Sequence, residues 1–317
     1  MANSLHPPSS ILHPPPLFLA GPTAVGKSEI ALLLAEKIGG EIISVDSMQV
    51  YQRLDIGTAK PSPAERARVP HHLIDVVDLV EPFDAAQFVR LATAAVADIQ
   101  SRGRVPIFCG GTGLYFKAFL EGLGDTPPAD QQLRAELETT PLPELLHELA
   151  ERDPVTFGKI DQKNSRRVIR AIEVIRLTNR PYSAQRSNWT HATRNPQPGL
   201  FAFSRSSEDL HHRINSRIDT MFAHSLVEET RHLLKHGLAQ NKNAMQALGY
   251  RQVVEHLHGE RGLPETIELV KIKTRQFAKR QMTWFKRQLN LEWIKLTPEE
   301  NLSQIAENIR HRLENPL

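Results

Sequence analysis

The residues that most directly predict a chemistry lie near the N-terminus, where the sequence reads G-x-x-x-x-G-K-S. They form a phosphate loop that consists of Gly21, Pro22, Thr23, Ala24, Val25, Gly26, Lys27 and Ser28. In this pattern, backbone N–H groups of a turn and of the helix after it point inward and surround a diphosphate. Lys27 adds a positive charge for the terminal phosphate, and the Ser28 hydroxyl suits Mg²⁺. The pattern predicts a diphosphate or triphosphate ligand, but it does not identify ATP.

This chemistry requires a strand before the loop and a helix after it, which we expect at residues 17–20 and 28–38. Continuous apolar runs at 41–45 and 105–109, with a helical pattern between them, indicate parallel strands that are buried on both faces. A later strand is expected at 200–204, and a long amphipathic helix at 264–288. We therefore predict an α/β fold with a parallel-sheet core like that of P-loop NTPases.

The middle of the chain has a different pattern. Helical signals replace the strands at 131–138, 142–152 and 164–177, and prolines lie at both borders. We expect an all-helical domain at 126–198, inserted into a core formed by residues 17–125 and 199–317. Residues 1–16 are rich in Pro, His and Ser and lack the pattern of a secretory signal, so we expect a disordered extension there.

Two short polar segments follow the predicted strands, at D-S-M-Q (46–49) and G-G-T (110–112). Ligands of parallel α/β sheets bind beyond the carboxyl ends of the strands, so both segments should share one crevice with the phosphate loop. Asp46 could be a Mg²⁺ partner or a base for the attacking group. A turn or helix-cap role is its structural alternative. Thr112 could donate its hydroxyl to a phosphate, or it could cap the following helix.

Positive charge is concentrated in two segments. Residues 159–194 and 271–287 each carry +7, although the net charge of the whole chain is +3, which leaves −11 for the remainder. Arg166 and Arg170 lie four residues apart on a predicted helix, a spacing that suits nucleic-acid phosphates. Basic segments on an acidic body indicate a polyanionic partner, and a solvated helix face is the alternative. Trp284 is interpreted as core packing rather than as a stacking platform.

The remaining composition indicates the cellular setting. No apolar stretch approaches the ~18–20 residues that are needed to cross a bilayer. The single cysteine, Cys109, cannot form an internal disulfide and fits a reducing cytoplasm. Since it ends an apolar run, we interpret it as a buried core residue rather than as a reactive thiol. We expect a cytoplasmic protein that is a monomer and does not bind membranes.

Together, these motifs resemble those of the bacterial tRNA dimethylallyltransferases, also called isopentenyl-tRNA transferases. The resemblance is carried by GPTAVGKS (21–28), DSMQVY (46–51), PHHLID (70–75), GGTGLY (110–115), ALGYRQ (247–252) and AKRQMTWF (278–285). It implies transfer of a dimethylallyl group from dimethylallyl diphosphate to N6 of the adenosine just 3′ of the anticodon, in tRNAs that read codons beginning with U. It also implies that the phosphate loop binds the prenyl diphosphate and that Mg²⁺ is required.

The resemblance further implies roles for individual residues. Lys27, Thr112 and Arg217 would contact the diphosphate, Ser28 would bind Mg²⁺, and Asp46 would accept the N6 proton. The implied contacts with tRNA are at Asp46, Ser47, Met48, Gln49, Thr112, Arg134, Lys163, Asn164, Ser165, Arg166, Arg167, Gln246, Ala247, Leu248, Gly249, Tyr250, Arg251, Arg275, Gln276, Lys279 and Arg280. The helical insertion would grip the anticodon stem. The main rival interpretation is a P-loop kinase for a nucleotide or another small molecule, which would have no need of two basic segments.

Overall fold

The structure is a computed structural model and describes residues 14–185 and 199–315. The described residues divide into two compact units, a larger one of 14–117 and 199–315 and a smaller one of 118–185. The first border therefore falls at Ala118, within a helix, and not at residue 126, where the sequence pattern changes. Most of the predicted N-terminal extension (1–13) and the end of the predicted insertion (186–198) lie outside the described residues.

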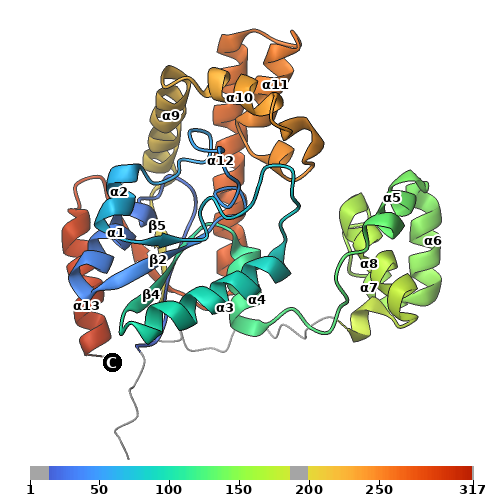
Figure 1. Cartoon of the computed structure of the whole chain (residues 1–317), viewed down its shortest axis with the longest axis horizontal. Helices are drawn as coiled ribbons and strands as arrows, with labels where there is room; N and C mark the ends of the chain where they lie inside the picture. The colour runs from blue at the N-terminus through green and yellow to red at the C-terminus, as the bar shows by residue number, and fades with distance from the viewer. Residues whose placement is uncertain (1–13, 186–198, 316–317) are drawn as a thin grey trace, which may run out of the picture. The chain divides into compact units, whose positions relative to one another are not determined.

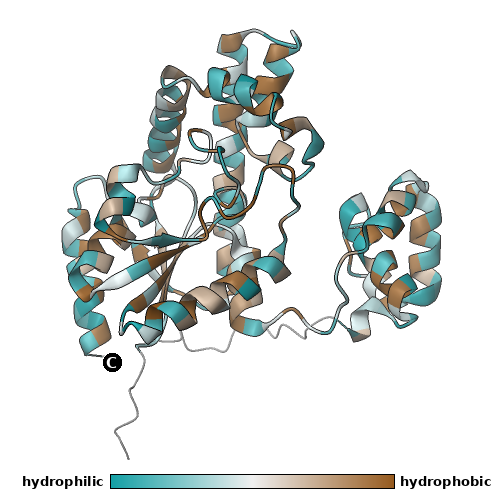
Figure 2. Ribbon diagram, viewed as in Figure 1, coloured by the Kyte–Doolittle hydropathy of each residue, from teal (hydrophilic) through white to brown (hydrophobic). Residues whose placement is uncertain are grey.

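A six-stranded sheet forms the centre of the larger unit (Figure 1). Its strands are β1 (Leu17–Ala20), β2 (Gly40–Val45), β3 (His71–His72), β4 (Val105–Gly110), β5 (Leu200–Ser204) and β6 (Glu292–Lys295). All neighbouring pairs are parallel, in the order β3-β2-β4-β1-β5-β6. Every residue of β1 and β2 is buried, including the polar Glu41 and Ser44 of β2, as is usual for central strands of a parallel sheet. In Figure 2 the hydrophobic residues of the sheet are brown. The predicted α/β fold is confirmed.

Helices cover both faces of this sheet. On one face, α1 (Lys27–Ile38), α9 (Ser207–Ala223) and α13 (Leu302–Glu314) share a hydrophobic cluster with Leu19 of β1. On the other face, α3 (Ala85–Ser101) and α4 (Gly113–Glu121) pack over the sheet, and Phe18 stacks on Phe108 with ring centroids 4.8 Å apart. The long helix α12 (Leu263–Gln288) supplies Val270 to the first cluster, and its Phe285 contacts Phe116 of α4. Helix α12 thus touches both layers.

Three shorter helices, α2 (Pro63–Arg68), α10 (Leu226–Leu234) and α11 (Tyr250–Leu257), complete the described part of the larger unit, together with the 3₁₀ turns η2 (Leu238–Gln240) and η3 (Ala244–Gln246). In the smaller unit the described elements are all helical, as predicted: α5 (Gln131–Thr139), α6 (Leu142–Arg152), α7 (Pro154–Phe157), α8 (Ser165–Thr178) and the turn η1 (Tyr182–Ala184). They enclose a separate core that includes Leu137, Leu149 and Ile172. Across both described ranges, no helix combines the length and the apolar character needed to cross a membrane.

Candidate active site

The phosphate loop connects β1 to α1. Gly21 and Gly26 have φ angles of +154° and +108°, in the range where a side chain is strained. A Cβ on Gly21 would also come within 3.1 Å of the Phe203 carbonyl oxygen. As the N-cap of α1, Gly26 has no side chain to occupy the first N–H groups of the helix. These groups are therefore available to an anion.

Two arginines bind the carbonyl groups of this loop. Arg205 Nε donates to the Val25 carbonyl at 2.8 Å, and Arg213 Nε donates to the Ala24 carbonyl at 2.9 Å. Arg205 is itself held by an ion pair with Asp209 at 2.7 Å. Because the C=O and N–H of a trans peptide unit point in opposite directions, anchoring these carbonyls turns the next N–H groups away from the arginines. Neither arginine was predicted from the sequence to have this role.

Lys27 is a cation without a carboxylate partner in the part of the chain that the structure describes. Its Nζ donates to the Pro22 carbonyl at 3.2 Å. Burial is the main cause that lowers the pKa of Lys27; Cys109 and Asp46 oppose this shift, and the charge of Arg217 adds to it. Arg217, on α9, lies at the same loop, with its Nη1 3.4 Å from Thr23 Oγ1. Two unneutralised cations at one loop are suited to an anionic ligand.

Ser28 and Cys109 differ in burial. Ser28 is exposed in the first turn of α1, whereas Cys109 is buried near the carboxyl end of β4. Burial raises the pKa of Cys109 to about 11, so the thiol is protonated at neutral pH. The interpretation of Cys109 as a buried core residue is confirmed.

Asp46 lies at the carboxyl end of β2 and begins the Asp46 turn, residues 46–49. Its Oδ1 accepts hydrogen bonds from the N–H groups of Met48 at 2.8 Å and Gln49 at 3.3 Å. The structural interpretation of Asp46 as a turn residue is therefore correct for this oxygen. No residue of the described ranges donates to Oδ2, which leaves that oxygen free to take a proton or to contact a metal. The choice between base and Mg²⁺ partner stays open.

Thr112 and Gln281 connect the Asp46 turn to the phosphate loop. The Ser47 N–H donates to Thr112 Oγ1 at 3.2 Å. A hydroxyl that accepts one bond can still donate its own proton, so Thr112 can also donate to a phosphate oxygen. Gln281 of α12 accepts from the Thr23 N–H and donates to the Gly111 carbonyl, both at 2.9 Å. The three segments predicted to share one crevice therefore meet.

The predicted tRNA contacts at 246–251 divide by burial. Gln246 and Arg251 are exposed and Leu248 is half-buried, whereas Ala247, Gly249 and Tyr250 are buried. The Tyr250 hydroxyl donates to Glu229 at 2.6 Å and accepts from the Gly57 N–H at 3.1 Å. Burial, followed by the charge of Glu229, raises the pKa of Tyr250. A direct contact between the Tyr250 side chain and tRNA is therefore not supported, because this side chain anchors the loop at Gly57.

Cations of the helical unit differ in their exposure. Arg134 and Arg170 both pair with the fully buried Glu173, at 2.9 Å and 2.6 Å. Arg170 also donates to the Pro127 carbonyl at 2.6 Å. The prediction that Arg170 faces nucleic-acid phosphates is therefore not supported. Exposed residues around the start of α8 are Lys163, Ser165, Arg166 and Arg167, with Asn164 as the helix N-cap.

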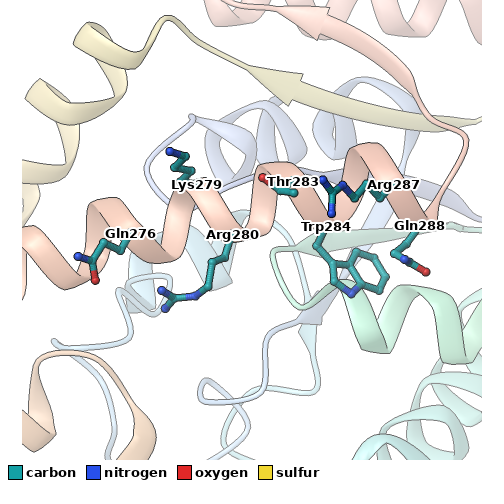
Figure 3. Close-up of a pocket in the computed structure, with 7 residues that line it drawn as sticks. All are labelled: Gln276, Lys279, Arg280, Thr283, Trp284, Arg287 and Gln288. Atoms are coloured by element: carbon teal, nitrogen blue, oxygen red, sulfur yellow. The ribbon is translucent and has the colours of Figure 1, made fainter. Parts of the chain in front are cut away.

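A cavity of about 510 Å³ lies along α12 (Figure 3). Its lining consists of Gln276, Lys279, Arg280, Thr283, Trp284, Arg287 and Gln288. Arg280 and Trp284 leave the helix on the same side in Figure 3. A Cβ on Gly113 would lie 2.1 Å from the Trp284 ring, so the indole packs on this glycine while its remaining surface lines the cavity. Trp284 therefore packs against the protein on one side but is half-buried and lines the cavity, so the choice between core packing and a stacking platform stays open.

Two groups of basic residues on α12 differ in their contacts. Toward its N-terminus, Lys271 pairs with Asp219 at 2.8 Å, and Arg275 donates to the Asn215 side chain at 2.8 Å. Further along, Lys279, Arg280 and Arg287 are exposed and have no carboxylate partner among residues 14–185 and 199–315. Only this second group combines charge with an open cavity.

The fold and the site define a class of protein, an α/β protein that has a P-loop-type phosphate site and a strongly basic helix beside it. The IPP transferase family model matches residues 49–288, and the chain belongs to this family. The matched range does not include the phosphate loop or Asp46. These residues therefore support the assignment independently of the family model.

Relatives cover nearly the whole chain. The chain is 47% identical to tRNA dimethylallyltransferase 1 of Citrifermentans bemidjiense, over 88% of this chain and 91% of the relative. It is 41% identical to tRNA dimethylallyltransferase of Pelotomaculum thermopropionicum, over 96% and 98%. Among solved structures, the tRNA isopentenylpyrophosphate transferase of Bacillus halodurans has 37% identity and a TM-score of 0.68, over 95% of this chain and 97% of that one. A eukaryotic dimethylallyltransferase acting on tRNA has 27% identity and a TM-score of 0.76, over 95% and 79%.

Proposed function

We propose that this chain transfers a dimethylallyl group from dimethylallyl diphosphate to N6 of an adenosine in tRNA. The acceptor would be the adenosine just 3′ of the anticodon, in tRNAs that read codons beginning with U. Relatives that span most of the chain are named tRNA dimethylallyltransferases, which disfavours the kinase alternative. The observation that carries the proposal is that hydrogen bonds of Gln281 and Thr112 join the phosphate loop to the Asp46 turn. Lys27 of the loop has no carboxylate partner in the described ranges, which suits an anionic leaving group. Oδ2 of Asp46 accepts no hydrogen bond there, which suits an incoming amine.

The proposed reaction forms one bond and breaks another. N6 of adenosine bonds to C1 of the dimethylallyl group, and the C1–O bond breaks so that its electron pair leaves with diphosphate. The N6 proton passes to Oδ2 of Asp46, while Oδ1 keeps the Asp46 turn in place. Lys27, Arg217, the Thr112 hydroxyl and the loop N–H groups stabilise the charge that develops on the diphosphate.

We also propose that Mg²⁺ takes part. Among the residues that the structure describes, no three His, Cys, Asp or Glu side chains gather into a metal site. The oxygens that are available at the phosphate loop are the Ser28 hydroxyl and Asp46 Oδ2. Such a small set fits Mg²⁺, which commonly uses one or two protein oxygens and completes its shell with substrate phosphates and water. The exposed Ser28 hydroxyl would hold the ion, and Asp46 Oδ2 is the other oxygen available to it. When bound, Mg²⁺ would neutralise charge on the diphosphate oxygens.

The proposed tRNA surface consists of the exposed cations. In the helical unit these surround the start of α8, and in the larger unit they line the α12 cavity. A flipped adenosine loses its stacking, which costs a few kcal/mol, and phosphate contacts must offset this cost. Because tRNA is the proposed substrate, we expect the protein to act in the cytoplasm.

Mass analysis of nucleosides tests this proposal. Unmodified tRNA is incubated with the protein, dimethylallyl diphosphate and Mg²⁺, digested, and compared with a reaction containing Lys27→Met. The proposal expects one adenosine per tRNA to gain the mass of a dimethylallyl group in place of a proton, and no gain with the variant. Unmodified adenosine in the parent reaction contradicts it.

A further inference from the structure

We propose that Gln281 is a positioning residue that fixes the phosphate loop relative to the Asp46 turn. The inference rests on the proposed function, because it concerns the spacing between the leaving-group site and the proposed base. Gln281 is buried, at 8% exposure, and lies on the inner side of α12. It does not line the α12 cavity, and neither the motif nor the family resemblance implied this role for it.

The orientation of the Gln281 amide is fixed by two backbone partners, one that can only donate a hydrogen bond and one that can only accept one. The Thr23 backbone N–H can only donate, so the group facing it is Oε1, at 2.9 Å. The Gly111 backbone carbonyl can only accept, so the group facing it is Nε2, also at 2.9 Å. An uncharged carboxamide supplies one acceptor and one donor at this spacing, whereas an ionised carboxylate would place an oxygen against the Gly111 carbonyl.

A continuous chain of contacts runs from this amide to Asp46. Gly111 directly precedes Thr112, whose Oγ1 accepts the Ser47 N–H at 3.2 Å. Ser47 directly follows Asp46. The close approach also explains the glycine at 111, because a Cβ there would lie 2.3 Å from Gln281 Nε2. Displacement of the amide would therefore move both the loop at Thr23 and the segment that holds Thr112.

Helix α12 gives this connection a rigid base. Ala278, Gln281 and Phe285 are buried on one side of the helix, and Phe285 packs edge-on against Phe116 with ring centroids 5.9 Å apart. Lys279 and Arg280 of the same helix line the open cavity. The helix that offers cations for the proposed tRNA surface thus also carries the residue that holds the diphosphate site.

Two variants test the proposal. Gln281→Met keeps the side-chain length and removes both hydrogen bonds. Gln281→Glu retains an acceptor for Thr23, and only its protonated form can donate to Gly111. Gln304→Glu, on the exposed side of α13, is the matched charge control. For each, we measure pyrophosphate affinity by calorimetry, kcat and KM for prenyl transfer, and the melting temperature.

We expect Gln281→Met to weaken pyrophosphate binding and to lower kcat/KM by about tenfold or more, since two hydrogen bonds of ~1 kcal/mol are lost. For Gln281→Glu, affinity relative to the parent at the same pH should recover as pH falls from about 8 to about 6, because protonation restores the donor. A merely structural residue would not show this recovery. Gln304→Glu should match the parent at every pH.

Parent-like affinity and kcat/KM in Gln281→Met would overturn the proposal, as would an affinity ratio for Gln281→Glu that stays constant with pH. If Gln281→Met fails to fold, the pH series on Gln281→Glu decides. Pyrophosphate affinity requires no tRNA chemistry. A parent that binds pyrophosphate but does not prenylate tRNA would contradict the proposed function, while the affinity ratios would still test Gln281.

Discussion

Replacing Asp46 by asparagine separates the two functions that the structure gives this side chain. The carbonyl oxygen of the introduced amide can replace Oδ1 as acceptor for the N–H groups of Met48 and Gln49, because only an acceptor satisfies them. The NH₂ group replaces Oδ2, the oxygen without a donor in the described ranges, and it cannot take a proton from adenosine N6. Asp46→Asn therefore keeps the turn and removes the proposed base.

The expected magnitude follows from these contacts. Loss of a general base lowers the rate of transfer by about 10²–10⁴-fold. The two turn hydrogen bonds, worth ~0.5–1.5 kcal/mol each, are retained, so the melting temperature should stay near that of the parent. Pyrophosphate affinity should be equal or tighter, because a negative charge near Lys27 has been removed. Asp46→Ala should lose both transfer and part of the stability.

Single-turnover prenyl transfer, pyrophosphate calorimetry and thermal melting are the three assays. Asp78→Asn is a matched control, since Asp78 Oδ1 accepts the Val80 N–H at 3.2 Å in a similar turn and Asp78 has no proposed catalytic role. Transfer by Asp46→Asn within about threefold of the parent rate, far from the loss expected on removal of a general base, would refute the base assignment. A rate loss accompanied by weaker pyrophosphate binding and a higher Mg²⁺ requirement would instead support the metal role.

Three further predictions concern the loop, the basic unit and the buried tyrosine. Burial lowers the pKa of Lys27, so the unfolded chain binds more protons between that pKa and about 10.4, and the charged lysine destabilises the fold at lower pH. Lys27→Met should therefore raise the melting temperature at neutral pH and abolish the rise caused by pyrophosphate; a lower melting temperature would contradict this. Arg166→Ala with Arg167→Ala should weaken tRNA binding and make the slope of log affinity against log salt shallower by about 1–2, and an unchanged slope in salt titrations would indicate a solvated face. Tyr250→Phe removes the hydroxyl that donates to Glu229 and accepts from the Gly57 N–H, while Glu229 still accepts from the N–H groups of Ile56 and Gly57. It should lower the free energy of unfolding by ~0.5–1.5 kcal/mol in denaturant titrations. Loss of tRNA affinity in this variant without loss of stability would indicate a direct contact.

Much of the fold can be predicted because buried parallel strands leave a strong local signal. The strand expected at 200–204 has those bounds in the structure, and the helix expected at 264–288 begins one residue earlier. Helix α2 was not predicted, because its six residues include none that is buried and so show no apolar period. Its one local signal is the capping box formed by Ser62 and Glu65.

The groups of the candidate site were predictable where local rules apply. Spacing identifies the phosphate loop, and the carboxyl ends of parallel strands locate Asp46 and Thr112. Gln281 and Arg213 contact this loop across 258 and 189 residues of sequence, and such contacts depend on how α12 and α9 pack over it. No local pattern encodes that packing.

Charge counting has a similar limit. A sum over 159–194 treats Arg170 as a free cation, whereas the structure pairs it with Glu173, three residues later and fully buried. An i, i+3 pairing can be anticipated from sequence, but burial of the carboxylate cannot. Exposure therefore separates Arg166 and Arg167 from Arg170, although all three contribute equally to the net charge.

The central claim is that the phosphate loop binds a prenyl diphosphate and releases its diphosphate only when tRNA accepts the prenyl group. Coupled measurement of pyrophosphate release and prenyl incorporation tests it most directly, with dimethylallyl diphosphate and ATP supplied separately and with or without tRNA. We expect one pyrophosphate per prenyl group, only with dimethylallyl diphosphate and tRNA together. Release of phosphate from ATP in the absence of any change in tRNA would contradict the claim.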